Sequence, residues 1–388
     1  MKILFLNYEL GSMESEAGEA TLALLAEYAK IPEMEIDLVT SSIDGKYHEL
    51  KMGENVAIYR IPNKNILGKP AYQSKKEPLS FIWQAYKFSR TLAKKRQYDL
   101  CHVFFSETFG RIALMLKWEF KLPFIVSLQG SDNVGYMDRE IILSKFKKPI
   151  SQKIFAKASF LIANSLWLRE WTLLSGLKKE IELIYNGFDA QSIFPDQSKR
   201  DSEKFVVICD TKIEPIMGLR FMIQALKLLA GRYDQIRLLI VGDGNEKQSL
   251  EDLARALGIK DKVRFMGEVP AEKIAGCYQQ ADLFVSTSLE DGINMKIAKA
   301  CAAGLPIVAM DTVWTREILR DGFNCLLAKN NEADDLADKI ERFVLDKELR
   351  DVFSKNNLSQ VEQFSWRNAA KKYFNIYTKT KNIKTLQD

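Results

Sequence analysis

The chain has 388 residues, 47% of them hydrophobic and 28% charged, and this length favours two domains that each bury a core of their own. Its net charge is only +5, no nucleic-acid-binding motif accompanies that charge, and no run of about 18 uncharged apolar residues is present to span a membrane. The apolar stretch at residues 1–6 is too short for the core of a signal peptide, so we expect a cytoplasmic protein. Because no nucleic-acid-binding motif is present, we expect no nucleic-acid partner.

Short apolar runs alternate with helical patterns along the first half of the chain. The expected strands comprise residues 2–8, 35–40, 55–60, 99–105, 123–128 and 160–164. The expected helices comprise residues 19–30, 80–96 and 110–120. Alternation of this kind is typical of a doubly wound parallel sheet.

A second alternating series follows the polar stretch at residues 191–204. Its expected strands comprise residues 205–210, 236–241, 264–266, 283–286, 306–309 and 325–327. Its expected helices comprise residues 219–232, 248–257, 271–280 and 295–303. The sequence therefore predicts an α/β protein with two Rossmann-like, doubly wound domains.

Basic residues gather in one part of the first half, since residues 51–157 hold 20 Lys and Arg against 8 Asp and Glu. In the helix expected at residues 80–96, Ile82 and Tyr86 recur at helical spacing beside several lysines, which gives a basic amphipathic surface. Two interpretations stay open: a solvated helix whose aromatic residues lie in the core, and attachment to an anionic membrane surface. Nucleic-acid binding is a weaker third interpretation, because no recognised binding motif accompanies the charge.

The cysteines and histidines restrict the chemistry that the protein can use. The five cysteines are widely spaced and form no Cys-x-x-Cys pair, which favours buried free thiols in a reducing compartment. The two histidines, His48 and His102, leave few candidates for a metal site or for histidine acid and base catalysis.

The most informative segment is residues 286–311, which is predicted to run from a strand through an acidic, glycine-containing turn into a helix. Gly292 lies in the turn, and the helix that follows stays apolar on one face until Gly304 and Pro306 end it. The free N–H groups at the start of such a helix favour an anion, so the segment is a candidate phosphate site.

This segment resembles the signature of the retaining, nucleotide-sugar-dependent glycosyltransferases of family 4, which have the GT-B fold. The family pattern has an acidic residue and a glycine followed by a glutamate, and these positions hold Asp291, Gly292 and Lys299 here. Four further turns that resemble the family occur in the expected order: Gly130-Ser131-Asp132, Asn186-Gly187-Phe188-Asp189, Gly242-Asp243-Gly244 and Asp321-Gly322-Phe323-Asn324.

The resemblance also identifies where this chain departs from the family at the donor diphosphate. An Arg and Lys pair stabilises the leaving diphosphate in the family, and the matching positions are Lys212 and Met217, so one cation is lost. Lys296 or Lys299 could supply the missing charge, or both could be solvent-exposed helix lysines. Lys299 also replaces a glutamate that, in the family, accepts hydrogen bonds from the ribose hydroxyl groups of the nucleotide sugar. An ammonium group can only donate hydrogen bonds.

The resemblance implies catalytic roles for Asp291, Lys212 and Gln129. It implies that nucleotide-sugar binding involves Lys212, Glu290, Asp291, Gly292, Ile293, Asn294, Met295, Lys299 and Gly242. It assigns Gly11, Ser12 and Asp132 to the acceptor side of the cleft. No metal or other cofactor is expected, because enzymes of this family use the nucleotide diphosphate sugar as a substrate and need no metal.

In the family the last helix returns to the first domain. The expected domains are therefore residues 1–190 with the helix 366–388, on the acceptor side, and residues 191–365, which bind the nucleotide sugar. These two domains are expected to face each other across a cleft.

We expect a retaining glycosyltransferase of the hexosyltransferase type that transfers a sugar from a nucleotide-sugar donor. Its expected acceptor is a lipid-linked glycan or a polysaccharide, such as a lipopolysaccharide, in cell-envelope glycan synthesis. Peripheral attachment to the inner face of the plasma membrane would follow if the basic surface binds anionic lipid. The alternative is a catalytically inactive, glycosyltransferase-like partner subunit or glycan-binding module, which the residues at positions 217 and 299 favour.

Overall fold

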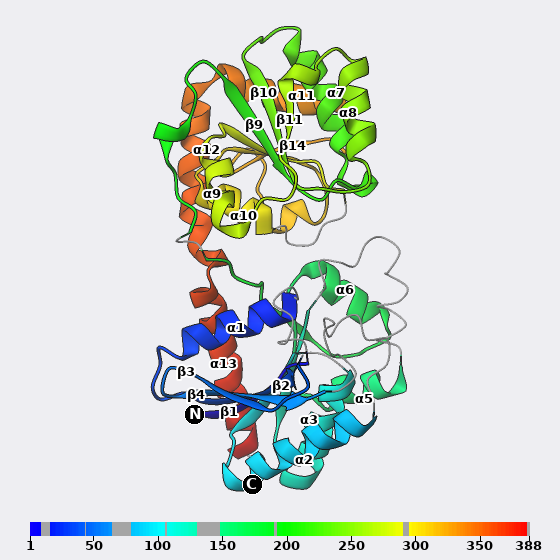
Figure 1. Ribbon diagram of the computed structural model, residues 1–388, viewed down its shortest axis with the longest axis vertical. Helices are drawn as coiled ribbons and strands as arrows, with labels where there is room; N and C mark the ends of the chain where they lie inside the picture. Colours follow the sequence, from blue (N-terminus) through cyan, green and yellow to red (C-terminus); the bar gives the residue numbers. More distant parts are fainter. Residues whose placement is uncertain are drawn as a thin grey trace. The chain divides into compact units, whose positions relative to one another are not determined.

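The structure, a computed structural model, describes residues 1–8, 16–42, 44–63, 79–104, 107–129, 148–189, 192–289 and 295–385. The chain divides into two compact units, one comprising Met1–Gly187 with Trp366–Asp388 and the other Phe188–Ser365 (Figure 1). This division differs from the domain bounds expected from the sequence only at residues 188–190.

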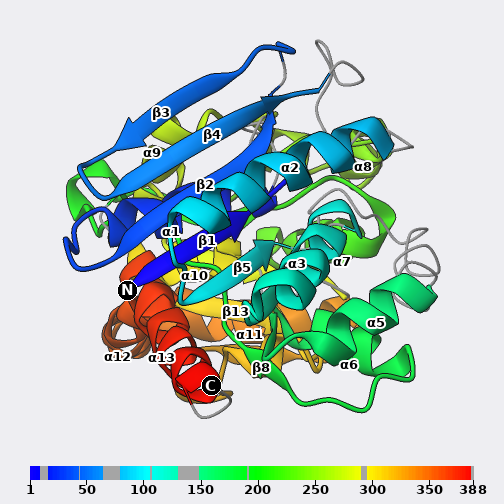
Figure 2. The same ribbon diagram turned by 90° about the horizontal axis from the view of Figure 1, so that it is seen from below.

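The first unit contains an eight-stranded sheet with the order β3-β4-β2-β1-β5-β6-β7-β8. All its neighbouring strands are parallel except β3, which pairs antiparallel with β4 at the sheet edge (Figure 2). Its strands are β1 (Lys2–Leu6), β2 (Glu35–Ser42), β3 (His48–Met52), β4 (Val56–Pro62), β5 (Leu100–Phe104), β6 (Phe124–Leu128), β7 (Leu161–Ala163) and β8 (Ile181–Leu183).

Helices cover both faces of this sheet because its strands are apolar on both sides. Along β1, Leu4 and Leu6 belong to the core under α2 and α3, whereas Ile3 and Phe5 belong to the core under α1 and α13. The helices are α1 (Glu16–Tyr28), α2 (Leu79–Lys95), α3 (Glu107–Phe120), α5 (Pro149–Lys157), α6 (Leu166–Leu174) and α13 (Trp366–Thr385).

The last helix, α13, belongs to the first unit although it follows the second unit in sequence. It lies beside α1, and the Tyr28 hydroxyl group on α1 donates a 2.9 Å hydrogen bond to the Ala370 carbonyl oxygen (Figure 1). The first unit therefore needs both ends of the chain to complete one of its two cores.

The second unit contains a six-stranded, all-parallel sheet with the order β11-β10-β9-β12-β13-β14. Its strands are β9 (Phe205–Asp210), β10 (Ile236–Val241), β11 (Val263–Phe265), β12 (Leu283–Ser286), β13 (Ile307–Met310) and β14 (Leu326–Ala328). Its helices are α7 (Leu219–Ala230), α8 (Lys247–Ala256), α9 (Ala271–Gln279), α10 (Met295–Ala302), α11 (Ala333–Leu345) and α12 (Lys347–Gln360).

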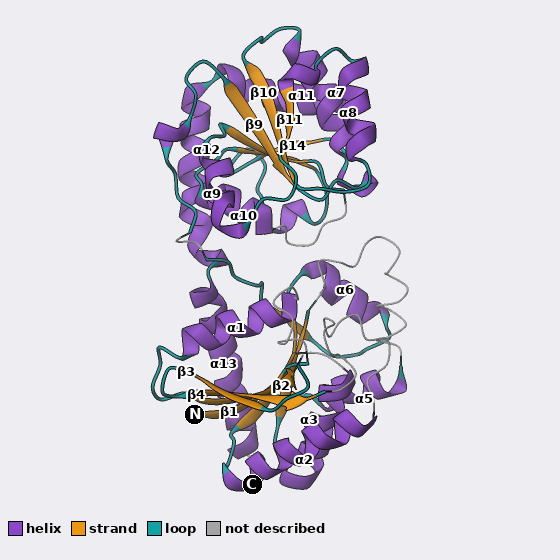
Figure 3. Ribbon diagram, viewed as in Figure 1, coloured by secondary structure: helices purple, strands orange, loops and turns teal. Residues whose placement is uncertain are grey.

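Alternate residues of the second sheet also serve two cores, with helices enclosing the strands in Figure 3. Val207 and Cys209 of β9 pack in the core with α7, α8 and α11, and Ile208 packs in the core with α9 and α10. The expected α/β architecture with two doubly wound sheets is confirmed. The strands β9, β10 and β12 begin and end at the predicted residues.

Two expectations and one missed strand can be compared with the structure. All five cysteines are buried and free, which confirms the prediction of buried free thiols. The edge strand β3 was missed because most of its residues are exposed, so it has no apolar face to reveal it. Within the described part of the chain, no helix combines the length and apolarity needed to cross a bilayer.

Candidate functional site

Three loops meet at the carboxyl edge of the second sheet, where parallel α/β sheets commonly bind ligands. They follow β9, β10 and β12, which are neighbours in the order β10-β9-β12. Two sequence-predicted site residues lie here, Lys212 in the loop after β9 and Gly242 in the loop after β10. Met295 and Lys299, on α10, belong to the helix that follows β12.

The loops after β9 and β10 are held together by backbone contacts that require glycine. The Ile213 N–H group donates to the Asp243 carbonyl oxygen at 2.9 Å. A Cβ atom on Gly242, whose φ angle is +126°, would lie only 2.0 Å from the Thr211 carbonyl oxygen, and one on Gly244 only 2.3 Å from that of Ile213. Gly242 therefore contributes close backbone packing that places the residues after β9.

The loop after β9 is also fixed to the end of β12. The Thr287 hydroxyl group donates a 2.6 Å hydrogen bond to the Met217 carbonyl oxygen. A Cβ atom on Gly218 would lie 2.6 Å from the Thr287 carbonyl oxygen, so these two backbones are in direct contact. Met217, which stands where the family has a lysine, thus lies against the end of β12.

Two buried hydroxyl groups lie at this edge without a hydrogen-bond partner among the described residues. They belong to Thr211, directly after β9, and Ser288, two residues after β12, and their residues are 7% and 5% exposed. A buried hydroxyl group without a partner costs free energy, so such groups commonly bind a ligand or a water molecule. Sequence analysis missed both residues, although a hydroxyl residue directly after a buried strand is a usable signal.

The last residue of β9 carries a buried carboxylate that contacts two other elements. Asp210 is 8% exposed, and it accepts a 2.8 Å hydrogen bond from the Tyr278 hydroxyl group on α9. The Lys296 ammonium nitrogen, on the first turn of α10, lies 3.9 Å from the other Asp210 oxygen. Burial and the adjacent Asp210 carboxylate raise the pKa of Tyr278 well above its ordinary value, so the phenol stays protonated and remains a donor.

The helix α10 positions the remaining described residues of the predicted set. Its buried residues include Ile297, Ala298 and Cys301, and these hold the helix against the second sheet. Met295, Lys296 and Lys299 are partly buried. The other predicted residues of this segment lie outside the described residues: Glu290, Asp291, Gly292, Ile293 and Asn294.

In the first unit, Gln129 directly follows β6, and its side chain is held by two asparagines. Its Oε1 atom accepts hydrogen bonds of 3.0 Å from the Nδ2 atoms of Asn164 and Asn186. Its buried Nε2 atom has no partner within the described ranges, so this amide can donate to a ligand. Gly11, Ser12 and Asp132, the predicted acceptor-side residues, lie outside the described residues.

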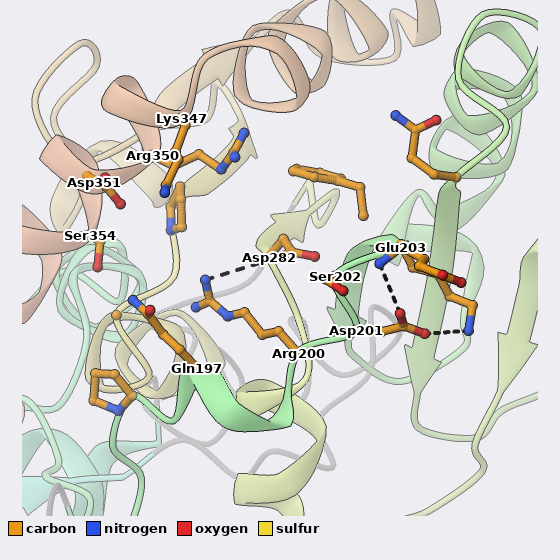
Figure 4. A pocket seen from close by; sticks show the side chains of 16 residues that line it. Gln197, Arg200, Asp201, Ser202, Glu203, Asp282, Lys347, Arg350, Asp351 and Ser354 are labelled. Atoms are coloured by element: carbon orange, nitrogen blue, oxygen red, sulfur yellow. Dashed lines mark hydrogen bonds and ion pairs between the residues drawn. The ribbon is translucent and has the colours of Figure 1, made fainter.

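A hollow of about 450 Å³ lies at the opposite, amino-terminal edge of the second sheet (Figure 4). Arg200 and Asp282 form a 3.9 Å ion pair in it, and Asp282 accepts a 2.8 Å hydrogen bond from the Val206 N–H group. Burial raises the pKa of Asp282. The hollow contains none of the predicted site residues. Its basic side chains are those of Arg200, Lys204, Lys347 and Arg350, and its acidic side chains are those of Asp201, Glu203, Asp282 and Asp351. These charges balance, so the hollow has no net charge that would select a charged ligand.

Comparison with known proteins relates both halves of the chain to enzymes that transfer sugars. Residues 190–360 match the family described as glycosyl transferases group 1, and residues 18–192 match the family described as Glycosyltransferase Family 4. An uncharacterized glycosyltransferase of Methanocaldococcus jannaschii is 24% identical over 315 residues, which cover 81% of this chain and 82% of that protein.

Two further proteins are similar to the chain. A phosphatidyl-myo-inositol mannosyltransferase of Mycobacterium leprae is 26% identical over 246 residues, which cover 62% of this chain and 64% of that protein. The structure of HepE from Anabaena, solved in complex with UDP, has a TM-score of 0.70 and 19% identity over 98% of this chain and 100% of that one. This last likeness extends through both units and confirms the GT-B fold.

Proposed function

Because this chain belongs to the group 1 and family 4 glycosyltransferases, we propose that it is a retaining enzyme that transfers a sugar from a nucleotide diphosphate sugar. One observation carries the proposal. At the carboxyl edge of the second sheet, Lys212 lies next to Thr211, whose buried hydroxyl group has no partner in the described part of the chain. A phosphate group would accept hydrogen bonds from both side chains.

The proposed role of Lys212 is electrostatic. Negative charge accumulates on the diphosphate as the bond to the sugar breaks, and a cation near it stabilises the transition state more than the ground state. No protein nucleophile or metal ion is required in this proposal, because the leaving phosphate can accept the proton of the acceptor hydroxyl group. The UDP bound to the similar HepE protein supports a nucleoside diphosphate as the binding group.

The proposed acceptor is a lipid-linked glycan or a polysaccharide at the inner face of the plasma membrane. The similarity to a phosphatidyl-myo-inositol mannosyltransferase supports a lipid-linked acceptor. Five buried free thiols are consistent with a reducing compartment.

The first unit also offers a surface that suits anionic lipid. Trp118 on α3 is 58% exposed, and the Lys153 ammonium nitrogen lies 4.8 Å from the centre of its ring. Trp83 on α2 is 53% exposed, and the Lys87 ammonium nitrogen lies 5.4 Å from its ring. Exposed tryptophans beside lysines suit a membrane interface with negatively charged headgroups.

Thermal unfolding with a panel of nucleoside diphosphates and nucleotide sugars tests the donor site. We expect at least one uridine, guanosine or deoxythymidine compound to raise the melting temperature, since a ligand that binds only the folded state stabilises it. Lys212→Ala should weaken that binding by about 1.5–3 kcal/mol, as expected for a hydrogen bond to a charged group. A panel without any stabilising compound would instead support the catalytically inactive module.

Flotation with vesicles tests the membrane surface separately. The protein should float with vesicles that contain anionic lipid and stay in solution with neutral vesicles, because lysines near such a surface contribute about 1 kcal/mol each. A double variant, Trp118→Ser with Lys153→Gln, should float less, whereas the control Leu345→Ser, at an exposed apolar residue of the second unit, should not change flotation. Equal flotation with both vesicle types would remove anionic lipid from the proposal, and no flotation with either type would remove the membrane.

A further inference from the structure

We propose that Lys296 binds the diphosphate of the donor in place of the cation missing at Met217, and that Asp210 and Tyr278 position its ammonium group. This inference rests on the proposed function, because it assigns a residue to the same donor site. Lys296 is the residue that touches the ligand, whereas Asp210 and Tyr278 act through it as positioning residues.

The first argument is the place of the Lys296 ammonium group. It lies 3.9 Å from an oxygen of Asp210, the last residue of β9, and the loop that begins there carries Thr211 and Lys212. The side chain of Lys296 is 31% exposed, so a ligand can reach it. The positive charge of Lys296 therefore lies at the end of β9, where the loop with Thr211 and Lys212 begins.

The second argument is that Met217 belongs to this same edge of the sheet. Its carbonyl oxygen accepts a hydrogen bond from Thr287, one residue beyond β12, and β12 pairs directly with β9. Met217, which lacks the charge, thus lies at the end of β12, and Lys296, which carries one, lies at the end of the neighbouring strand β9. A thioether side chain cannot replace an ammonium group beside a phosphate, whereas Lys296 supplies that group from a different element.

The third argument is the cost of burying Asp210. A buried carboxylate is unfavourable unless charged and hydrogen-bonding groups compensate it, and Asp210 has the Tyr278 hydroxyl group at 2.8 Å and Lys296 at 3.9 Å. The 3.9 Å contact places the Lys296 ammonium nitrogen beside the Asp210 carboxylate. An ammonium group has three N–H donors, so it can face Asp210 and a phosphate oxygen together.

The arrangement also explains the role of Tyr278. Its hydroxyl oxygen lies 2.8 Å from Asp210 and 3.3 Å from the Lys296 carbonyl oxygen, so α9, β9 and the first turn of α10 meet at one atom. The ring is fully buried and stacks on Phe284 of β12 with a 6.0 Å separation of the ring centres. The backbone of Lys296 is therefore fixed as well as its side chain.

Isothermal titration with the nucleoside diphosphate that binds the wild-type protein, and with the corresponding nucleoside, tests the inference. Lys296→Met should weaken diphosphate binding about 10- to 100-fold, the range of one charged hydrogen bond, and leave nucleoside binding within about twofold. Lys296→Arg should restore most of the diphosphate affinity, because it keeps the charge. The control Lys273→Met removes an exposed lysine from α9 and should change neither affinity.

A second variant separates binding from folding. Removing Lys296 alone leaves Asp210 buried without its cation, so Lys296→Met could unfold the second unit. The double variant Asp210→Asn with Lys296→Met removes both charges and should fold, yet still lose diphosphate affinity. Asp210→Asn alone should weaken diphosphate binding by a smaller factor than Lys296→Met and leave nucleoside binding unchanged.

The outcomes distinguish the two proposals. If Lys212→Met weakens diphosphate binding but neither Lys296→Met nor the double variant does, the donor site stands and Lys296 is a structural partner of Asp210. If no diphosphate binds the wild-type protein, the proposed function and this inference both fail. An equal loss of nucleoside and diphosphate affinity in the double variant would also overturn the inference, because it would indicate a general distortion of the site.

Discussion

The Nδ1 atom of His102, in the middle of the first sheet, lies 2.8 Å from the hydroxyl oxygen of Tyr377, a residue 275 positions later on α13. The other ring nitrogen, Nε2, lies 2.7 Å from the Ser127 hydroxyl oxygen, and Ser127 in turn donates to the Tyr373 hydroxyl oxygen at 3.0 Å. All four side chains are buried. The return of α13 to the first sheet is therefore fixed by directional polar contacts as well as by apolar packing.

Removal of the Tyr377 hydroxyl group should destabilise the first unit. Tyr377→Phe leaves a buried ring nitrogen of His102 without its partner, which costs about 1–3 kcal/mol of unfolding free energy. Urea unfolding followed by tryptophan fluorescence measures this change, since five of the six tryptophans lie in the first unit. The control Thr378→Val removes an exposed hydroxyl group from the same helix and should change little, and equal effects of the two variants would contradict the role of His102.

The same histidine should make the first unit sensitive to acid. Burial lowers the pKa of His102 to about 3, against about 6.5 in the unfolded chain. Between these values the unfolded state binds a proton that the folded state does not, so the unfolding free energy falls as the pH falls. His102 alone should contribute a loss of about 2 kcal/mol between about pH 7 and pH 5.

Other groups also titrate in this range, so the measurement is a difference between two proteins. His102→Gln cannot take up a proton near neutral pH, and its unfolding free energy should decline less than that of the wild-type protein over the same interval. Urea unfolding at both pH values provides the comparison. Parallel declines would mean that His102 is already charged in the folded state.

Gly242 should tolerate no side chain. A Cβ atom there would lie 2.0 Å from the Thr211 carbonyl oxygen, so Gly242→Ala must move the loops after β9 and β10 apart. We expect a loss of at least about 3 kcal/mol in the stability of the second unit, in the range of severe steric changes. Gly258→Ala is the matched control, since Gly258 has a φ angle of +67° with no atom within 4 Å of its Cβ position.

That control should cost only about 1–2 kcal/mol, the penalty for a left-handed backbone conformation. Thermal unfolding of the two variants separates crowding from backbone strain. Comparable losses would show that the contact between Gly242 and Thr211 relaxes easily.

The Thr211 hydroxyl group should affect stability and binding in opposite directions. Thr211→Val has a similar shape and removes a buried hydroxyl group that has no partner in the described part of the chain. The ligand-free second unit should become more stable by about 1 kcal/mol, while nucleoside diphosphate binding should weaken by a similar amount. Thermal unfolding with and without the ligand measures both changes, and a variant that is destabilised and binds normally would remove Thr211 from the site.

Much of the fold could be predicted because buried parallel strands produce clear apolar runs. The strands β9, β10 and β12 occur at the residues predicted for them, and their order in the chain placed Lys212 and Gly242 at strand ends. The edge strand β3 could not be found in this way, because residues such as Glu49 and Lys51 are exposed. An apolar pattern indicates which residues are buried, so it cannot reveal a strand whose residues are exposed to solvent.

The sequence by itself determined the two alternating series, the glycine-dependent turns and the substitutions at positions 217 and 299, because these depend on residue type and local spacing. Only the tertiary structure showed that Asp210, Tyr278 and Lys296 meet, since each comes from a different element and the packing of α9 and α10 on the second sheet brings them together. The same holds for His102 and Tyr377. A polar contact between distant segments leaves no periodic pattern in the chain, so it becomes visible only when the sheet and its helices have packed.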